Sequence, residues 1–318
     1  MIKLPLRRTV VALVAIFAAT ATTASAHPFS PNKEFRLDEF AVPSDLIAGP
    51  DDAMYAPDGS LSQVWRVSQR GKVSSSFVGA SPAGAAVGRD GALWVTDRFP
   101  AAVHRISPRG KVTTYPLANL DAFPTSIVSG PDGALWFTET RGDAIGRITL
   151  DGQITEYPLA TSGAFASEIT VGPDGALWFT EAMGNKVGRI TTAGVVTEFP
   201  LPTSDALPGP IVAGADGALW FGERNTNAIT RMTTSGVITA SHAIPAANAD
   251  PTSLATDREG RIWIAEHSAG QLQSMTLEGE FGRPVRTRHA PDSIAFDRYG
   301  DLWYAASSDS RIGRVDVD

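Results

Sequence analysis

The ten residues Gly130-Pro-Asp-Gly-Ala-Leu-Trp-Phe-Thr-Glu139 decide the fold, because the same segment returns along the chain. It recurs almost unchanged as Gly172–Glu181. Weaker copies are Gly88–Asp97, Gly214–Glu223, Gly49–Ala56, Asp257–Glu266 and Asp297–Ala306. The aromatic residues of the copies are Tyr55, Trp94, Trp136, Trp178, Trp220, Trp263 and Trp303, at successive gaps of 39, 42, 42, 42, 43 and 40 residues. Seven near-equal periods predict seven copies of one supersecondary unit.

Each unit contains four short stretches rich in β-branched and aromatic residues, with turn residues between them. In the fourth unit the stretches are Glu168–Val171, Ala176–Thr180, Lys186–Ile190 and Val195–Phe199. Asp-Gly pairs tolerate the positive φ of a tight turn, and proline cannot donate to a strand ladder. Four strands in about 42 residues match one blade of a β-propeller. The sequence therefore predicts an all-β fold, a seven-bladed β-propeller of four-stranded blades.

The two ends of the chain predict how the ring closes. The last unit stops after its third strand, Arg311–Val315, while Phe35–Phe40 resembles the fourth strands of other units. Pairing this N-terminal strand beside Arg311–Val315 would complete the seventh blade and remove an open sheet edge. We therefore expect a single propeller domain over residues 27–318, with its strands beginning near residue 33.

Composition and charge restrict the classes of function. The 318 residues are 43% apolar and 19% charged, as in a globular protein. The chain has no cysteine, which excludes disulfides, thiolate catalysis and cysteine-ligated metals. Its net charge is −7, and Lys/Arg runs are absent beyond the first eight residues, which argues against nucleic acid as a partner.

The first 26 residues read as a secretory signal peptide. Lys3, Arg7 and Arg8 precede an apolar run over residues 10–20, and Ala24-Ser25-Ala26 supplies the small residues of a cleavage site. Cleavage is expected before His27 and would change the net charge from −7 to −10. The apolar run is too short for a membrane-spanning helix. The sequence thus predicts a periplasmic or secreted protein without a membrane span.

The residue near the start of each unit's first strand should face the mouth of the propeller channel. Across the units these residues are Ser44, Ala83, Thr125, Ser167, Gly209, Thr252 and Asp292. The units diverge at this position, and divergence within a repeat is where a specific site is built. Most of these residues are small, which indicates an open and mildly polar depression. Asp292 is the exception.

Two other repeated positions have a structural and a functional interpretation. The residue that ends the second strand is acidic in five units, at Asp97, Glu139, Glu181, Glu223 and Glu266. Such a ring either binds a cation or basic ligand or accepts hydrogen bonds within the blades, and its repetition favours the structural role. The tryptophans of the units are expected to pack between neighbouring blades. Trp65 lies outside this register.

Histidines provide the candidate acid–base groups. His104 occupies a third strand, which favours a structural role, and His27 would form an N-terminal tail. His289 and Asp292 lie in one loop of the last blade, and His267 belongs to the blade before it. We take Asp292 and His289 as candidate catalytic residues, because a general base beside Arg286 and Arg288 would suit a carboxylate or lactone substrate. The alternative is that they are solvated loop residues.

The decapeptide unit, followed by Ile145-Gly-Arg-Ile-Thr149 and Ile154-Thr-Glu-Tyr-Pro-Leu159, resembles the virginiamycin B lyase (streptogramin lyase) family over essentially the whole mature chain. The resemblance implies a seven-bladed propeller and an enzyme that opens a cyclic depsipeptide antibiotic at its ester by elimination, with a magnesium ion. It also implies histidines in a Pro-His-Gly/Ala-Ile motif at the start of late blades. The counterparts here are Pro208–Ile211, Pro251–Leu254 and Pro291–Ile294, which place Gly209, Thr252 and Asp292 at the histidine position, and Ala290 stands where an acidic residue is expected.

Three functions are compatible with these observations. The first is a binding scaffold without the family's histidines, which takes a small molecule, glycan or protein on its mouth. Its binding residues would be Ser44, Thr125, Ser167, Thr252, Asp292 and His267. The second is a carbon–oxygen lyase or a lactonase acting on a cyclic ester such as a streptogramin B antibiotic, with Mg²⁺ or Ca²⁺ as cofactor. The third is an envelope-associated interaction protein. A closed ring needs no partner strand, so we expect a monomer.

Overall fold

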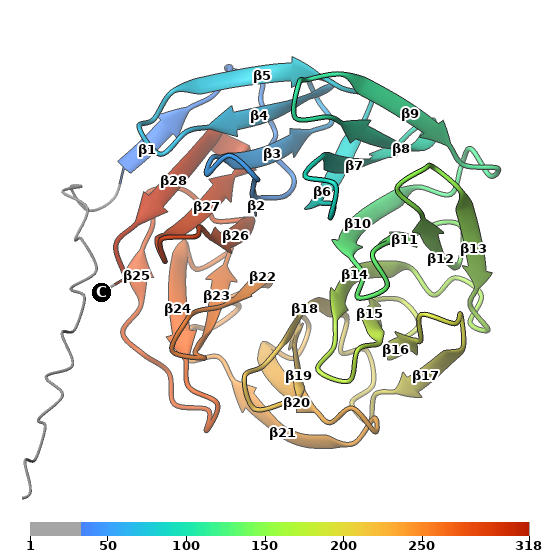
Figure 1. Ribbon diagram of the computed structural model, residues 1–318. Helices are drawn as coiled ribbons and strands as arrows, with labels where there is room; N and C mark the ends of the chain where they lie inside the picture. Colours follow the sequence, from blue (N-terminus) through green and yellow to red (C-terminus); the bar gives the residue numbers. More distant parts are fainter. Residues whose placement is uncertain (1–32, 318) are drawn as a thin grey trace, which may run out of the picture. The chain divides into compact units, whose positions relative to one another are not determined.

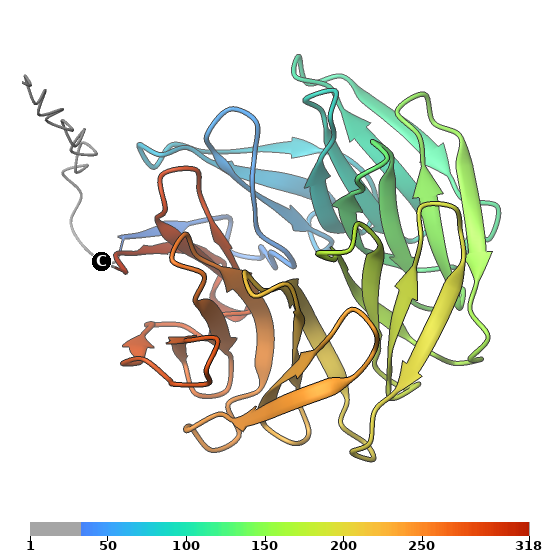
Figure 2. The same cartoon turned by 60° about the horizontal axis from the view of Figure 1, so that its bottom comes forward.

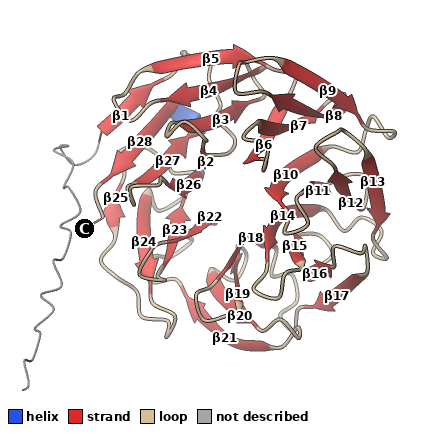
Figure 3. Ribbon diagram, viewed as in Figure 1, coloured by secondary structure: helices blue, strands red, loops and turns tan. Residues whose placement is uncertain are grey.

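Seven four-stranded antiparallel sheets form a ring around a central channel in the computed structural model, which describes residues 33–317 (Figure 1). Within this range the only helical turn is η1 (Ser307–Asp309), and strands make up the rest of the regular structure (Figure 3). No helix in the described part of the chain has the length and hydrophobicity of a membrane span. The predicted signal peptide, its cleavage site and His27 lie outside the described residues.

Each blade contributes one strand to each of four concentric positions. The innermost strands of blades 1 to 7 are β2 (Ile47–Ala48), β6 (Pro82–Val87), β10 (Pro124–Ser129), β14 (Ala166–Val171), β18 (Pro208–Ala213), β22 (Pro251–Thr256) and β26 (Ser293–Phe296). The second strands are β3 (Met54–Asp58), β7 (Leu93–Arg98), β11 (Leu135–Glu139), β15 (Leu177–Glu181), β19 (Leu219–Glu223), β23 (Ile262–Glu266) and β27 (Leu302–Ala306). The third strands are β4 (Gln63–Val67), β8 (Ala101–Ile106), β12 (Ala144–Ile148), β16 (Lys186–Ile190), β20 (Ala228–Met232), β24 (Gln271–Met275) and β28 (Arg311–Val315). The outer strands are β5 (Val73–Phe77), β9 (Val112–Pro116), β13 (Ile154–Pro158), β17 (Val196–Pro200), β21 (Ile238–Ala243), β25 (Val285–Arg286) and β1 (Lys33–Arg36).

The predicted closure by the N-terminal strand is confirmed. β1 pairs antiparallel with β28, from Lys33 opposite Arg314 to Arg36 opposite Arg311, and Figure 2 shows this blue strand beside the red strands of blade 7. The strand occupies residues 33–36, whereas the sequence predicted Phe35–Phe40. It ends early because the chain turns after Leu37, where the Ala41 amide donates to the Asp38 carbonyl.

The outer strand of blade 4, in contrast, ends one residue later than predicted. Pro200 belongs to β17 and lies opposite Lys186. Proline is tolerated there because the outer strand is a sheet edge, where a missing N–H costs no ladder bond.

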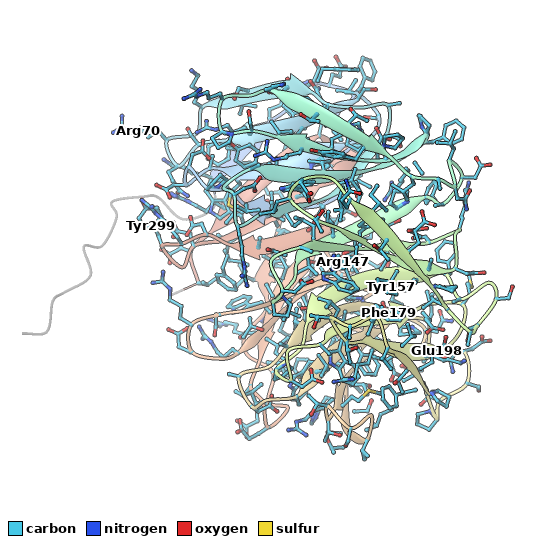
Figure 4. The ribbon with its side chains drawn as sticks, turned by 45° about the vertical axis from the view of Figure 1, so that its right-hand side comes forward. Arg70, Arg147, Tyr157, Phe179, Glu198 and Tyr299 are labelled. Atoms are coloured by element: carbon cyan, nitrogen blue, oxygen red, sulfur yellow. The ribbon has the colours of Figure 1, made fainter. Side chains whose placement is uncertain are left out.

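The repeated tryptophans lie between blades, as their packing shows in blade 3. Trp136 is fully buried in a cluster that includes Phe179 of blade 4 and is flanked by Tyr157 (Figure 4). Asp132 accepts hydrogen bonds from Trp136 Nε1 at 3.1 Å and from Arg147 Nε at 2.8 Å. Corresponding Asp–Trp–Arg groups recur in blades 2, 4 and 5. Because the same contacts repeat in several blades, we assign them to the stability of the scaffold and not to a specific functional site.

A bulge shapes the inner strands near the channel. In blade 3 the pairing of β10 with β11 shifts between Pro124 and Ile127, and blades 2, 4, 5 and 6 have a shift at the same place. Bulges re-aim side chains and are common beside functional sites. Here the bulge places the mouth residue and the one after it, Thr125 and Ser126 in blade 3, together on the channel lining.

Candidate functional site

The channel mouth is a small polar cavity of about 120 Å³. It lies on the face that carries the starts of the inner strands, the turns between second and third strands, and the connections from one blade to the next; we call this the mouth face. The predicted residues that line the cavity are Ser44, Ala83, Thr125, Thr252 and Asp292. Ser167, Gly209 and His267 do not line it.

The hydroxyl groups of the mouth hold strands and blades together. Ser44 Oγ donates to the Ala83 carbonyl at 2.7 Å, and Thr252 Oγ1 lies 3.2 Å from the Pro291 carbonyl, each bridging to the next blade. Thr125 Oγ1 lies 2.7 Å from Thr140 Oγ1, and Ser167 Oγ lies 2.9 Å from Thr180 Oγ1. These contacts give the predicted binding hydroxyls a structural task.

Three charged side chains in the cavity were not singled out from the sequence. Asp45, Arg98 and Glu168 come from blades 1, 2 and 4 and all line the channel. Asp45 accepts from the Leu46 and Ala85 amides at 2.7 and 3.1 Å, and Glu168 accepts from Ser126 Oγ at 3.0 Å. The sequence does contain a signal, because the position after the mouth residue is acidic only in these two units, Asp45 and Glu168.

Burial shifts the pKa values of Asp45, Arg98 and Glu168 in the channel. Burial, followed by the negative charge of Asp45, raises the pKa of Glu168 to about 7, and burial also raises the pKa of Asp45. Desolvation lowers the pKa of Arg98, against the attraction of Glu168 and Asp45. Arg98 Nε is buried without a hydrogen-bond partner. The cavity therefore holds two buried acids whose pKa values are raised and one buried cation whose pKa is lowered.

The structure brings together two of the three candidate acid–base residues of blades 6 and 7. His267 Nδ1 lies 2.9 Å from Asp292 Oδ1, and Asp292 Oδ2 accepts from the Ser307 amide and hydroxyl at 2.6 and 2.5 Å. His289 instead lies between Asp309, at 3.0 Å, and Glu34 of β1, at 3.7 Å. His289 is thus directed to the outer part of blade 7, away from its proposed partner Asp292.

The acidic residues that end the second strands do not line the channel. All five predicted members are buried within their blades, and a sixth, Asp58 of blade 1, stands at the same place three residues after Tyr55. In four blades a side chain of the third strand donates to the acid; in blade 6 it is Gln271 Nε2, 2.7 Å from Glu266 Oε2. Trp65 Nε1 lies 2.8 Å from Asp58, His104 Nε2 2.9 Å from Asp97, and Thr230 Oγ1 2.8 Å from Glu223. These contacts also give Trp65, which lies outside the aromatic register, and His104 a structural role.

Blades 3 and 4 lack that donor. Their third strands carry Gly146 and Gly188, and a Cβ atom at either position would lie 2.1 Å from the ring of Phe137 or Phe179. Glu139 Oε1 and Glu181 Oε1 are consequently buried without hydrogen-bond partners. Burial, followed by the charge of Glu156, raises the pKa of Glu139 to about 8.

Four exposed apolar side chains lie on the mouth face over blades 2 to 4, and Phe40 and Val42 are exposed in the connection that leads into blade 1. Phe99 and Met183 are in turns between second and third strands, and Leu120 and Phe165 are in connections between blades. Beside them, the Arg141 guanidinium lies over the Phe123 ring at 4.2 Å. Apolar side chains exposed on the face that carries the channel mouth make this face a candidate binding surface. We call these four exposed residues and the Arg141–Phe123 pair the apolar rim.

The described residues contain no group of three or more His, Asp or Glu side chains that could hold a metal ion. The magnesium implied by the family resemblance would need acidic ligands near the late-blade motifs. Ala290 and Thr252 offer no carboxylate there, and the carboxylate of Asp292 is engaged by Ser307 and His267. The residues present therefore do not fit that ion.

Comparison with known proteins identifies close structural and sequence relatives. A sequence model of the virginiamycin B lyase family matches residues 76–318. A streptogramin B lyase structure is 32% identical, with a TM-score of 0.85 over 90% of this chain and 97% of the other. Virginiamycin B lyase from Staphylococcus aureus is 33% identical, with a TM-score of 0.85 over 90% of this chain and 99% of the other.

A catalytically inactive histidine-to-alanine variant of the Staphylococcus aureus enzyme, with quinupristin, is 34% identical, again with a TM-score of 0.85 over 90% and 99% of the two chains. No curated protein matches the sequence.

Proposed function

Because the chain belongs to the virginiamycin B lyase family, we propose that it uses the family's propeller as a binding scaffold and does not carry out the family's elimination reaction. Its ligand would be a small molecule with apolar groups, held on the mouth face. Streptogramin B depsipeptides are the first candidates, since relatives are named for acting on them.

One observation carries the proposal: the residues at the family's histidine positions are engaged in structural contacts. Thr252 Oγ1 contacts the next blade at the Pro291 carbonyl. Asp292 Oδ2 accepts two hydrogen bonds from Ser307, which hold its carboxylate against the turn after β27. Elimination needs a group that takes a proton from carbon, and neither side chain is free to do so.

Binding without catalysis has a counterpart among the relatives. The Staphylococcus aureus variant that lost one histidine is catalytically inactive, yet its structure is with quinupristin. In this fold, therefore, a histidine can be lost while the ligand is still held. The apolar rim offers this chain a surface for such a ligand, because it combines exposed apolar side chains with the Arg141 cation.

The His267–Asp292 pair favours a second candidate, a lyase or lactonase acting on a cyclic ester. Both side chains are partly exposed, and His267 Nδ1 lies 2.9 Å from Asp292 Oδ1, although the two atoms are not aligned for a hydrogen bond. A small rotation of the imidazole would pair it with the carboxylate, as a general base requires. In an elimination, His267 would take the proton α to a carbonyl. The bond from the β carbon to the ester oxygen would break, and the carboxylate would leave.

The deciding experiment is to titrate the mature protein with quinupristin by calorimetry and to follow the antibiotic by chromatography and mass spectrometry. Samples with Mg²⁺, with Ca²⁺ and with a chelator are run in parallel. We expect saturable binding and an intact ring under all three conditions. Ring opening without mass change would establish elimination, and a gain of one water would establish hydrolysis; either result would refute the scaffold proposal.

Matched variants locate the binding surface. Phe165→Ser/Met183→Ser removes two exposed side chains from the apolar rim and should abolish binding without unfolding the protein. Val195→Ser/Val237→Ser removes exposed apolar side chains from the opposite face and should leave binding unchanged. If ring opening is seen, its loss in His267→Ala would assign the base.

The compartment and the oligomeric state complete the proposal. We propose that the protein is exported through its leader and acts in the periplasm or outside the cell as a monomer. N-terminal sequencing of the exported protein, with His27 expected first, and sedimentation of the mature chain test both statements.

A further inference from the structure

Stacked aromatic rings fill one position at the outer edge of five blades. In blade 3, Tyr157 of β13 stacks on Trp136 with ring centroids 5.5 Å apart. The corresponding pairs are Tyr115 on Trp94, Phe199 on Trp178, His242 on Trp220 and Phe35 on Trp303, at 5.5 to 5.9 Å. Blade 6 has the aliphatic Val285 at this position of its outer strand.

Each of these rings also covers a turn glycine of the next blade. A Cβ atom at Gly152 would lie 2.0 Å from Tyr115, and one at Gly194 would lie 2.1 Å from Tyr157. The same holds for Gly236, Gly279 and Gly71, which face Phe199, His242 and Phe35. Each ring thus lies in a space between two neighbouring blades, with the aromatic residue of its own blade on one side and the turn glycine of the next blade on the other. We call each such space a slot.

The slot between blades 1 and 2 lacks its ring. Ser76 lies opposite Val64, the pairing position at which Tyr157 lies opposite Ile145 in blade 3. The aromatic residue of this strand, Phe77, stands one position later and is 74% exposed. A shift of one residue sends a strand side chain to the other face of the sheet.

The glycine of this slot is correspondingly uncovered. A Cβ atom at Gly110, the turn glycine of blade 2, would meet nothing within 4 Å. On the other side, Tyr55 replaces the usual tryptophan, which leaves still more space.

A cavity of about 380 Å³ results. It is lined by apolar side chains of both blades, among them Val64, Leu93 and Ile106, and by Gly110 and Ser76. Its rim carries Arg66, whose Nε lies 2.8 Å from Asp51 and 3.2 Å from the Tyr55 hydroxyl. An apolar pocket of this size with a few polar groups at its edge is within the range of small-molecule sites, about 300–1,000 Å³.

We propose that this slot, which we call the blade 1–2 slot, binds a small molecule through one phenol-type aromatic ring. The ring would lie between Tyr55 and Gly110 in the place that Tyr115 and Tyr157 occupy in their own slots. Its polar substituent would reach Ser76 and the Arg66–Asp51 pair at the rim. The slot opens among turns on the side opposite the mouth face, so the site is separate from the proposed ligand site there.

The test is an amide NMR titration of the mature protein with 4-fluorophenol. Saturable shifts are expected at the amides of Tyr55, Ser76 and Gly110, with a dissociation constant of about 1 mM, as suits a fragment of eight heavy atoms. Ser76→Phe places a ring in the slot and should weaken binding about tenfold or more. It should also raise the melting temperature by roughly 3 °C, since an aromatic ring is buried.

Two controls keep the proposal open to refutation. Ser75→Phe adds the same ring on the other face of β5 and should leave binding unchanged. If Ser76→Phe does not fold, Ser76→Val, which puts into the slot the aliphatic side chain that Val285 supplies in blade 6, should also weaken binding. Shifts that do not saturate by about 10 mM, or binding that survives in Ser76→Phe, would overturn the proposal. Binding of a tyrosine-containing peptide in place of 4-fluorophenol would also overturn it, in favour of a protein partner.

Discussion

Replacing Glu139 by glutamine should remove a large part of the pH dependence of stability. The side chain is 1% exposed, its Oε1 has no hydrogen-bond partner, and burial raises its pKa from the ordinary value of 4.5 to about 8. The folded protein therefore holds a proton at Glu139 that the unfolded chain releases above its ordinary pKa. This contribution to stability is fully present below about pH 4.5 and is lost as the pH rises through about 8.

The size of the effect follows from these two pKa values. Each pH unit between them costs about 1.4 kcal/mol of unfolding free energy, and the cost levels off above the folded-state pKa. From pH 6 to pH 9, ionisation of Glu139 should lower the free energy of unfolding by about 3 kcal/mol. Glu168 and Glu181, whose pKa values burial raises to about 7, add to the slope but are present in both proteins and cancel in the comparison.

Urea unfolding at pH 6 and pH 9 measures this difference. Glu139→Gln should lose about 3 kcal/mol less than the unchanged protein over this range, although the buried amide lowers its stability at both pH values. Glu278→Gln, in an exposed turn, should behave as the unchanged protein. Equal pH dependence in Glu139→Gln and the unchanged protein would refute the assignment of an unpartnered, protonated carboxyl group at this position.

Two further substitutions test the scaffold. Phe35→Ala removes the phenyl ring stacked on Trp303 at 5.5 Å and should lower the free energy of unfolding by about 3 kcal/mol. Phe40→Ala, at an exposed position, should change it little. Equal effects of the two substitutions would mean that the packing of β1 does not hold the propeller closed. Gly188→Ala sets a methyl group 2.1 Å from the Phe179 ring and should lower the free energy of unfolding by about 1–3 kcal/mol, and with it the melting temperature. An unchanged melting temperature in calorimetry would show that the blade has room for the methyl group.

The mouth illustrates where sequence interpretation succeeded and where it failed. The start of each inner strand was located correctly, because period and gap lengths fix equivalent positions, and five of the seven mouth residues line the cavity. The charged group of Asp45, Arg98 and Glu168 was missed. Its members come from three blades, and only closure of the ring brings them to one channel.

The acidic residues at the ends of the second strands were likewise predicted in part. Their repetition correctly favoured positions inside the blades, and Asp58, which stands at the same position three residues after Tyr55, was missed. Whether each acid has a partner depends on a residue of the neighbouring third strand, such as Trp65, His104 or Gly146. That relation follows from strand register and not from spacing within a repeat.

The sequence by itself determined the number of blades, the four strands of each blade, the closure by the N-terminal strand and the family. These are local and periodic properties, since turn residues and alternating side chains repeat every 42 residues or so. Tertiary structure alone decided that His289 turns away from Asp292, that Glu139 lies unpartnered in the interior, and that the slot beside Gly110 is empty. Each of these depends on which side chains of neighbouring strands and blades are in contact. Those contacts follow from strand register and blade packing, which cannot be inferred from the spacing of residues along the chain.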